Sequence, residues 1–338
     1  MRATLLCAAA LAAASLASRA SAADSASFTL TDAAVAAVPP RFVSFSIEVG
    51  SAPQVFLVGG LGAAPRASLA RLLNALREAA GDAAGAMIRV GGNSADESAW
   101  VPTGDLPNGT TYRITTADLD SYEAAVPAWN GTLVLDITLR YTGKSGTDLD
   151  VAHLTSALGR LGTSLVEGVE IGNEVDLFFE NGIRARSYVY DDHKPEFALA
   201  AAAVAPVLAP AGRPMLQGAT WCSNHWTVAN FSDYVATFGA AFGSISLHRY
   251  AASVCNGDKA TIEELMADKA SEGLAQNLAP WIAAVPSTIP FYIGEGNSVS
   301  CGGAAGVSDR WAAALWSLDV LFQVASAGVK RWSFHGSE

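Results

Sequence analysis

The sequence predicts a barrel of eight parallel β-strands surrounded by helices, the (β/α)8 or TIM-barrel fold. Eight apolar, β-rich runs alternate with Ala- and Leu-rich segments of helical spacing. Two of the runs lead into glutamates, Glu174 and Glu295, that lie far apart in the chain. Eight βα units require roughly 250 residues or somewhat more. The chain has 338 residues, which is long enough for one such domain.

The expected strands are short apolar runs bounded by turn residues. They are residues 42–49, 86–91, 132–139, 168–172, 214–220, 244–250, 290–294 and 329–334. The expected helices lie between them, and their apolar residues recur three or four positions apart. They are residues 67–80, 151–161, 196–208, 262–278 and 308–327. Strands that alternate with helices pair in parallel, so all of these strands should end on one face of the barrel.

An open, doubly wound sheet is the competing architecture for this alternation. Such a sheet carries a glycine-rich phosphate-binding turn directly after its first strand. Residues 58–62 are glycine-rich, but they lie beyond the expected first strand and lack the full fingerprint. The barrel is therefore the preferred prediction.

The N-terminus has the pattern of a secretory signal peptide, residues 1–22. Arg2 supplies a basic start, residues 5–16 form an apolar run, and Ala20-Ser-Ala22 fits cleavage by signal peptidase. The run is too short to span a bilayer, and no other stretch approaches the required ~20 apolar residues. We therefore expect a secreted protein with no membrane partner. The net charge of −11 argues against a nucleic-acid partner.

Glycosylation triplets and cysteines fit export. Asn108, Asn130 and Asn230 each begin an Asn-X-Ser/Thr triplet and are candidate N-glycan sites. Cys7 would leave with the signal peptide, and the remaining three cysteines allow one disulfide and one free thiol. Each follows an expected strand end. We favour a Cys255–Cys301 bond between neighbouring loops, with Cys222–Cys255 as the open alternative.

Two glutamates are the strongest candidates for chemistry. Glu174 ends the fourth expected strand and Glu295 ends the seventh, and catalytic side chains of such barrels lie at these strand ends. Enzymes that hydrolyse glycosides generally use a pair of carboxyl groups that flank the scissile bond of the sugar. The amide of Asn173 could donate a hydrogen bond to a sugar hydroxyl. The chain shows no catalytic triad and no HExxH metal spacing, so we expect no metal and no organic cofactor.

Strand alternation predicts which other side chains point inward. Glu48 should reach the mouth of the barrel, either to bind substrate or as a buried salt-bridge partner. Arg89 should also point inward, where it needs an acidic partner. The partner of Arg89 could be Asp136 on the third strand, or it could be whichever of the two candidate catalytic carboxylates acts as the nucleophile. We favour the nucleophile. His248 and Tyr250 share one side of the sixth strand, and the phenol either binds the nucleophile or is a satisfied core group.

The chain resembles glycoside hydrolase family 79, the β-glucuronidase and heparanase family. The segments that carry the resemblance are 45–48 (FSIE), 88–94 (IRVGGNS), 170–174 (EIGNE), 247–250 (LHRY) and 293–298 (IGEGNS). The resemblance implies that Glu174 is the acid/base and Glu295 the nucleophile of a retaining enzyme. It also implies that Asn173 contacts the 2-hydroxyl of the sugar, that Glu48 helps to hold its far hydroxyls, and that Arg89 and Tyr250 flank the nucleophile. We expect these four residues and His248 to form the substrate-binding site.

The resemblance further implies that a uronate carboxylate binds backbone amides of the turn formed by Cys301, Gly302 and Gly303. Ser300 and Cys301 stand where the family usually has a tyrosine. The family also has a C-terminal β-sandwich that borrows an N-terminal strand. We therefore expect residues 23–41 to be an orphan strand of a missing sandwich, and residues 42–338 to form the catalytic barrel of a truncated chain.

The expected function is that of a secreted, retaining, β-glucuronidase-like hydrolase acting on glycans or proteoglycans. One alternative is a related retaining β-glycosidase that acts on neutral sugars. The other is a catalytically silent barrel that only binds carbohydrate.

Overall fold

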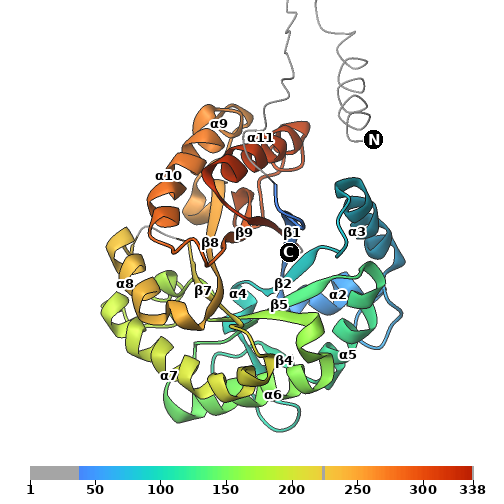
Figure 1. The fold of residues 1–338 in the computed structure, drawn as a ribbon, viewed down its shortest axis with the longest axis vertical. Helices are drawn as coiled ribbons and strands as arrows, with labels where there is room; N and C mark the ends of the chain where they lie inside the picture. Colours follow the sequence, from blue (N-terminus) through green and yellow to red (C-terminus); the bar gives the residue numbers. More distant parts are fainter. Residues whose placement is uncertain (1–37, 223–224, 337–338) are drawn as a thin grey trace, which may run out of the picture. The chain divides into compact units, whose positions relative to one another are not determined.

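A computed structural model describes residues 38–222 and 225–336, and these residues form a closed, eight-stranded barrel (Figure 1). The strand order around the barrel is β1-β10-β9-β8-β7-β6-β5-β2, and each neighbouring pair is parallel. Helices surround the barrel on its outside. The predicted TIM-barrel fold is confirmed.

Each of the eight expected strands overlaps a strand of the barrel. The strands are β1 (Val43–Glu48), β2 (Met87–Gly91), β5 (Thr132–Ile137), β6 (Val166–Ile171), β7 (Leu216–Trp221), β8 (Phe242–Ser253), β9 (Phe291–Ser300) and β10 (Arg331–Gly336). β8 and β9 run past their predicted ends because they remain paired as far as Ser253 opposite Ser300. Glu295 therefore lies within β9, and the prediction that it ends a strand is wrong. The polar, glycine-containing sequence after residue 294 concealed this extension.

The helices confirm most of the expected pattern. The longer ones are α3 (Ala67–Ala80), α5 (Thr116–Ala125), α6 (Gly143–Leu165), α7 (Tyr190–Leu208), α8 (Val228–Phe238), α10 (Glu272–Ala283) and α11 (Trp311–Ala327). The expected helix 262–278 is divided into α9 (Ile262–Leu265), a 3-10 turn (Asp268–Ala270) and α10. The backbone of Ala267 is extended between α9 and this turn, which interrupts the helix. The sequence did not predict α5, α8 or the small sheet of β3 (Ser98–Trp100) and β4 (Tyr112–Ile114).

The outside and the inside of the barrel strands bury different kinds of side chain. Apolar residues such as Ile88, Leu135 and Val169 are buried in the hydrophobic core. Alternate residues on the same strands are polar and equally buried, among them Arg89 and Asp136. Because side chains alternate across a strand, these polar residues share the inner face of the barrel. The barrel interior is thus a hydrogen-bonded network beneath the strand ends.

The predictions for the N-terminal segments concern residues that the structure mostly does not describe. The predicted signal peptide, 1–22, and most of segment 23–41 lie outside the described residues. Within residues 38–222 and 225–336, every helix is too short or too polar to cross a membrane.

Candidate active site

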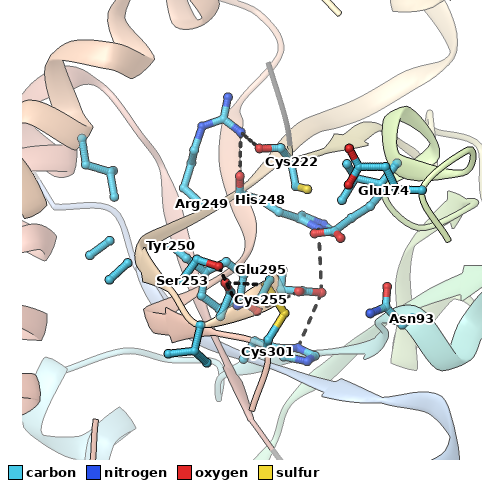
Figure 2. A pocket seen from close by; sticks show the side chains of 18 of the residues that line it. Asn93, Glu174, Cys222, His248, Arg249, Tyr250, Ser253, Cys255, Glu295 and Cys301 are labelled. Carbon is cyan, nitrogen blue, oxygen red and sulfur yellow. Dashed lines mark hydrogen bonds and ion pairs between the residues drawn. A yellow bond between two sulfur atoms is a disulfide. The ribbon is translucent and has the colours of Figure 1, made fainter. Parts of the chain in front are cut away.

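A large cleft of about 1310 Å³ opens where the barrel strands end. It is lined by five of the residues that the sequence singled out, namely Glu48, Glu174, His248, Tyr250 and Glu295. Small-molecule sites usually occupy roughly 300–1,000 Å³. Figure 2 shows four of these side chains converging, with His248 and Tyr250 from β8, Glu295 from β9 and Glu174 from the loop after β6. The cleft is larger than a single sugar residue requires.

The two candidate glutamates meet at the centre of this cleft. One carboxylate oxygen of Glu174 and one of Glu295 lie within 4.8 Å of each other and of a ring nitrogen of His248. Both glutamates are largely buried, with exposed fractions of 8% and 6%. The fold therefore brings together two carboxyl groups that are 121 positions apart in the sequence.

Arg89 holds one of these carboxylates from inside the barrel. Its Nη1 donates to Glu295 Oε2 at 2.8 Å, and its Nη2 donates to Asp136 Oδ2 at 3.0 Å. Both partners that the sequence left open are therefore bound. Its Nε also donates to Glu170 Oε2 at 2.5 Å. Although burial lowers it, the charges of these three carboxylates raise the pKa of Arg89 above its usual value, so the guanidinium is permanently charged.

The other oxygen of Glu295 is also held. The hydroxyl of Tyr250 donates to Glu295 Oε1 at 2.8 Å, as one of the two predicted alternatives required. Burial, followed by the charge of Glu295, raises the pKa of Tyr250. The phenol therefore stays protonated and remains a donor. With Arg89 on one oxygen and Tyr250 on the other, Glu295 is an acceptor at both.

Glu174 lies in a different electrostatic environment. Burial raises its pKa above the ordinary value, although a hydrogen bond from the Cys222 thiol lowers it in part. His248 Nδ1 is 2.9 Å from Glu174 Oε1. Burial lowers the pKa of His248 to about 4, so the imidazole is neutral at neutral pH. A neutral ring nitrogen can accept from a protonated Glu174, and the other tautomer can donate to an ionised one.

Glu48 lines the cleft and is also an ion-pair partner of His335. Its carboxylate accepts hydrogen bonds from the backbone amide of Ser94, at 2.8 Å, and from the Ser94 hydroxyl. His335 Nε2 lies 3.3 Å from Glu48 Oε1. Burial raises the pKa of Glu48, but His335 and Ser94 outweigh it and lower the pKa overall. Glu48 is therefore ionised at neutral pH.

Two residues of this site, His335 and Asp96, were not predicted from the sequence. His335 lies between Glu48 and Glu295, with its Nδ1 3.6 Å from Glu295 Oε2, and these carboxylates raise its pKa against the effect of burial. Its place at the end of the eighth strand was the available signal. Asp96 is buried, and its carboxylate accepts the backbone amides of Leu139 and Asn173, at 2.7 and 2.8 Å. Asp96 lies in a four-residue helix after β2, where no sequence pattern marks it.

Asn173, Gly302 and Gly303 do not line the main cleft. Asn173 is buried beneath it, where its Oδ1 accepts a hydrogen bond from Arg89 at 2.8 Å. The two glycines line a smaller cavity of about 230 Å³ that shares Tyr250 and His335 with the cleft. The predicted disulfide, Cys255–Cys301, is present and joins the loops that follow β8 and β9.

The group formed by Glu174, His248 and Glu295 is also a geometrically feasible cation site, because one donor atom from each lies within 4.8 Å of the others. The guanidinium of Arg89 is 2.8 Å from Glu295, and its charge would repel a cation there. Both oxygens of Glu295 already have donors. The donor set therefore fits a hydrogen-bonded pair of acids better than a metal centre.

The closed parallel barrel is a fold that this chain shares with solved structures of glycoside hydrolases. Solved structures with this fold include a 4-O-α-L-rhamnosyl-β-D-glucuronidase from Fusarium oxysporum 12S. It superposes with a TM-score of 0.70 at 18% identity, over 89% of this chain and 64% of that chain. A family 51 α-L-arabinofuranosidase from Bifidobacterium longum gives a TM-score of 0.57 at 12% identity, over 89% and 67%.

In sequence, the chain is similar to a β-glucuronidase from Aspergillus niger. The two are 28% identical over 328 residues, which cover 90% of this chain and 59% of the relative. The chain thus spans less than two thirds of the length of that relative. A comparison with models of protein families finds no match.

Proposed function

We propose that this chain is the catalytic barrel of a retaining glycoside hydrolase similar to the β-glucuronidases of family 79. The observation that supports this most is the pair of carboxyl groups, whose nearest oxygens lie within 4.8 Å. Retaining enzymes hold their two carboxyl groups roughly 5–5.5 Å apart, whereas inverting enzymes leave about 6.5–9.5 Å for a water molecule. The observed separation favours the retaining mechanism.

The surroundings of each glutamate support a division of roles. Glu295, held as an acceptor by Arg89 and Tyr250, attacks the anomeric carbon. Glu174, whose pKa is raised by burial, carries the proton that is transferred to the leaving oxygen. The products of this step are a covalent glycosyl-enzyme and the free aglycone.

The second step reverses the proton transfer. When Glu295 has become an ester, it no longer offsets the positive charge of Arg89 near Glu174. The pKa of Glu174 therefore falls, and the carboxylate can remove a proton from the attacking water. His248 Nδ1 remains beside Glu174 and provides a hydrogen-bond partner in both protonation states.

A β-linked glucuronide is the proposed substrate, carried by a glycan or proteoglycan. The relative from Aspergillus niger is a β-glucuronidase, and the neighbour from Fusarium oxysporum is a rhamnosyl-glucuronidase. We place the sugar carboxylate in the smaller cavity, against the amides of Gly302 and Gly303. Backbone amides suit an anion because they supply partial positive charge without a buried cation. His335 lies at the edge of this cavity, and because Glu295 and Glu48 raise its pKa against the effect of burial, it supplies a positive charge there when it is protonated.

A neutral sugar is the alternative substrate, because Ser300 and Cys301 replace the tyrosine that usually precedes the glycines. The ratio of kcat/KM for an aryl β-glucuronide to that for the matching aryl β-glucoside separates the two. A ratio well above one supports the glucuronide. A ratio well below one supports the neutral sugar.

The experiment that tests catalysis uses an activated 2-fluoro glycuronide, with intact mass as the readout. We expect one adduct per protein molecule, located on Glu295. Glu295→Gln should form no adduct and lose turnover by about 10⁴-fold or more. Glu263→Gln, an exposed glutamate on α9, is the matched control and should behave as the wild type. A folded wild type that forms no adduct would indicate the silent carbohydrate-binding barrel.

We also propose that the protein is exported after removal of residues 1–22 and carries N-glycans. Asn108 and Asn130 are exposed, whereas Asn230 is half-buried and its side chain caps α8 through Thr227. We therefore expect the first two sites to be more fully glycosylated than the third. Peptide mapping of the protein secreted by a eukaryotic host measures each occupancy.

A further inference from the structure

Glu174 has a backbone conformation that its own sequence does not favour. Its φ and ψ are both +48°, in the left-handed region where residues other than glycine are uncommon. The preceding turn contains Gly172, at φ +80°. A left-handed glutamate persists only where the surrounding structure determines its conformation. The contacts that hold this turn therefore also hold the direction of the carboxyl group.

Thr220 on β7 makes two of these contacts. Its carbonyl oxygen accepts the backbone amide of Glu174 at 3.1 Å. Its hydroxyl lies 2.7 Å from the carbonyl oxygen of Gly172 and 2.5 Å from that of Ala219, so one proton is shared between two acceptors. Thr220 thus forms hydrogen bonds with both ends of the three-residue turn that runs from Gly172 to Glu174.

These hydrogen bonds of Thr220 lie beyond the point where regular sheet pairing between β6 and β7 ends. Within the described residues, the register of these strands is defined at Val169 opposite Leu216. Further along β7, the pairing with β8 shifts register between Ala219 and Trp221. The Thr220 contacts therefore take the place of a ladder at the end of the barrel where the candidate site lies.

Thr220 is itself strained and does not reach the cleft. Its φ is +57°, which is an outlier for a β-branched residue, and its neighbour Ala219 is at +73°. Its exposed fraction is 1%, and it is absent from the residues that line the cleft. Strain at a buried residue beside an active site points to a role in that site.

We propose that Thr220 is a positioning residue that aims the Glu174 carboxyl group at the leaving oxygen. The inference rests on the proposed function, because it assigns a role in proton transfer by Glu174. Loss of the Thr220 hydroxyl should release Gly172 and let the turn relax. The carboxyl group would then deliver its proton less well, while Glu295 and its donors would be unaffected.

The test compares variants with and without the hydroxyl. Thr220→Val keeps the shape and the β-branch but removes the donor, and Thr220→Ser keeps the donor. Thr220→Ala also lacks the hydroxyl and relieves the β-branched strain, so it serves if the valine variant folds poorly. The substrates are phenyl and 2,4-dinitrophenyl β-glucuronides, which differ in their need for a proton.

For the valine and alanine variants, we expect kcat/KM on the phenyl glycoside to fall about 10-fold or more. On the dinitrophenyl glycoside, kcat/KM should stay within about twofold, because this leaving group needs no acid. Sodium azide should raise kcat of the valine variant on the dinitrophenyl substrate, since azide attacks the glycosyl-enzyme without a general base. The serine variant should match the wild type on both substrates.

Equal losses on both substrates would overturn the inference, because they would indicate general damage to the barrel. An unchanged phenyl rate in the valine and alanine variants would overturn it as well. A wild type that hydrolyses neither substrate would remove the proposed function together with the inference. The fluoro-sugar adduct on Glu295 of the wild type separates these failures, because it requires the nucleophile but no proton donor.

Discussion

A single guanidinium organises the polar interior of the barrel. All five N–H groups of Arg89 are used, by three carboxylates, the Ser46 hydroxyl and the Asn173 amide oxygen. Its side chain is completely buried. A buried charge is costly unless every donor has a partner, and this geometry meets that condition. Arg89 therefore links stability of the barrel to orientation of Glu295.

We predict that Arg89→Met lowers the free energy of unfolding by about 3–5 kcal/mol, because it leaves carboxylates buried without their cation. Denaturation by urea, followed by circular dichroism, measures the change. Arg160→Met is the matched control, since Arg160 binds Asp120 and Glu123 with about half of each side chain exposed. Exposed ion pairs contribute about 1 kcal/mol or less. Similar losses in both variants would contradict this account of Arg89.

At the scale of elements, the extension of β8 and β9 shapes one wall of the cleft. Beyond the barrel rim the two strands stay paired from Tyr250 opposite Asn297 to Ser253 opposite Ser300. The Cys255–Cys301 disulfide follows at once and joins the two strand ends. Residues of this ribbon, including Ser253 and Ser300, line the cleft. The wall is thus fixed covalently at its outer end.

We predict that the double variant Cys255→Ser and Cys301→Ser is less stable and binds substrate less well. The bond joins residues 46 positions apart, and the loss of such a bond costs about 2–5 kcal/mol. We expect a lower Tm and a raised KM, because the β8–β9 wall loses its restraint. An unchanged KM would show that backbone pairing alone fixes the wall. Wild-type protein with and without a mild reductant provides a second comparison.

At the scale of the whole molecule, buried acids make stability depend on pH in two opposite senses. Burial by itself would raise the pKa of Glu167, but the charges of Arg331 and Arg41 outweigh it and lower this pKa to about 2. This group stabilises the fold above its ordinary pKa of 4.5, and the contribution is lost as pH falls toward 2. Burial raises the pKa of Asp96 to about 6, so its contribution is present below 3.8 and is lost as pH rises through 6.

We therefore predict that stability is greatest near pH 4–5 and declines on both sides. Glu167→Gln should remove up to about 3 kcal/mol at pH 5 and far less near pH 2, because Glu167 is already about half protonated at its pKa of about 2. Thermal unfolding from pH 2 to pH 8 measures both limbs. Glu263→Gln is again the exposed control. A variant and wild type that differ equally at pH 2 and pH 5 would contradict the assignment.

An exposed apolar stripe runs along α11. Its side chains are Trp311, Leu315, Leu318 and Phe322, each more than half exposed and spaced for one helix face. Exposed apolar patches of this kind promote association. We predict that Leu315→Gln with Phe322→Gln lowers self-association in sedimentation velocity and leaves kcat/KM unchanged. Leu72→Gln, at an exposed leucine on α3, is the control and should have little effect.

The sequence by itself determined the barrel and its two central acids. Alternating apolar runs set the strand number, because every strand needs one face against the helices. A short apolar run, typical of a barrel strand, leads into each of Glu174 and Glu295 and so indicated both positions. The alternation of side chains along each strand also indicated that Arg89 and Tyr250 point into the barrel.

Only the tertiary structure decided how these groups are held. The left-handed turn at Glu174 depends on Thr220, which is 46 positions away, and local propensity would not predict it. Asp96 and His335 join the site through contacts with distant strands. The length of β8 and β9 came from their pairing with one another, because hydrogen bonds between strands can extend a sequence whose few apolar residues do not mark a strand by themselves.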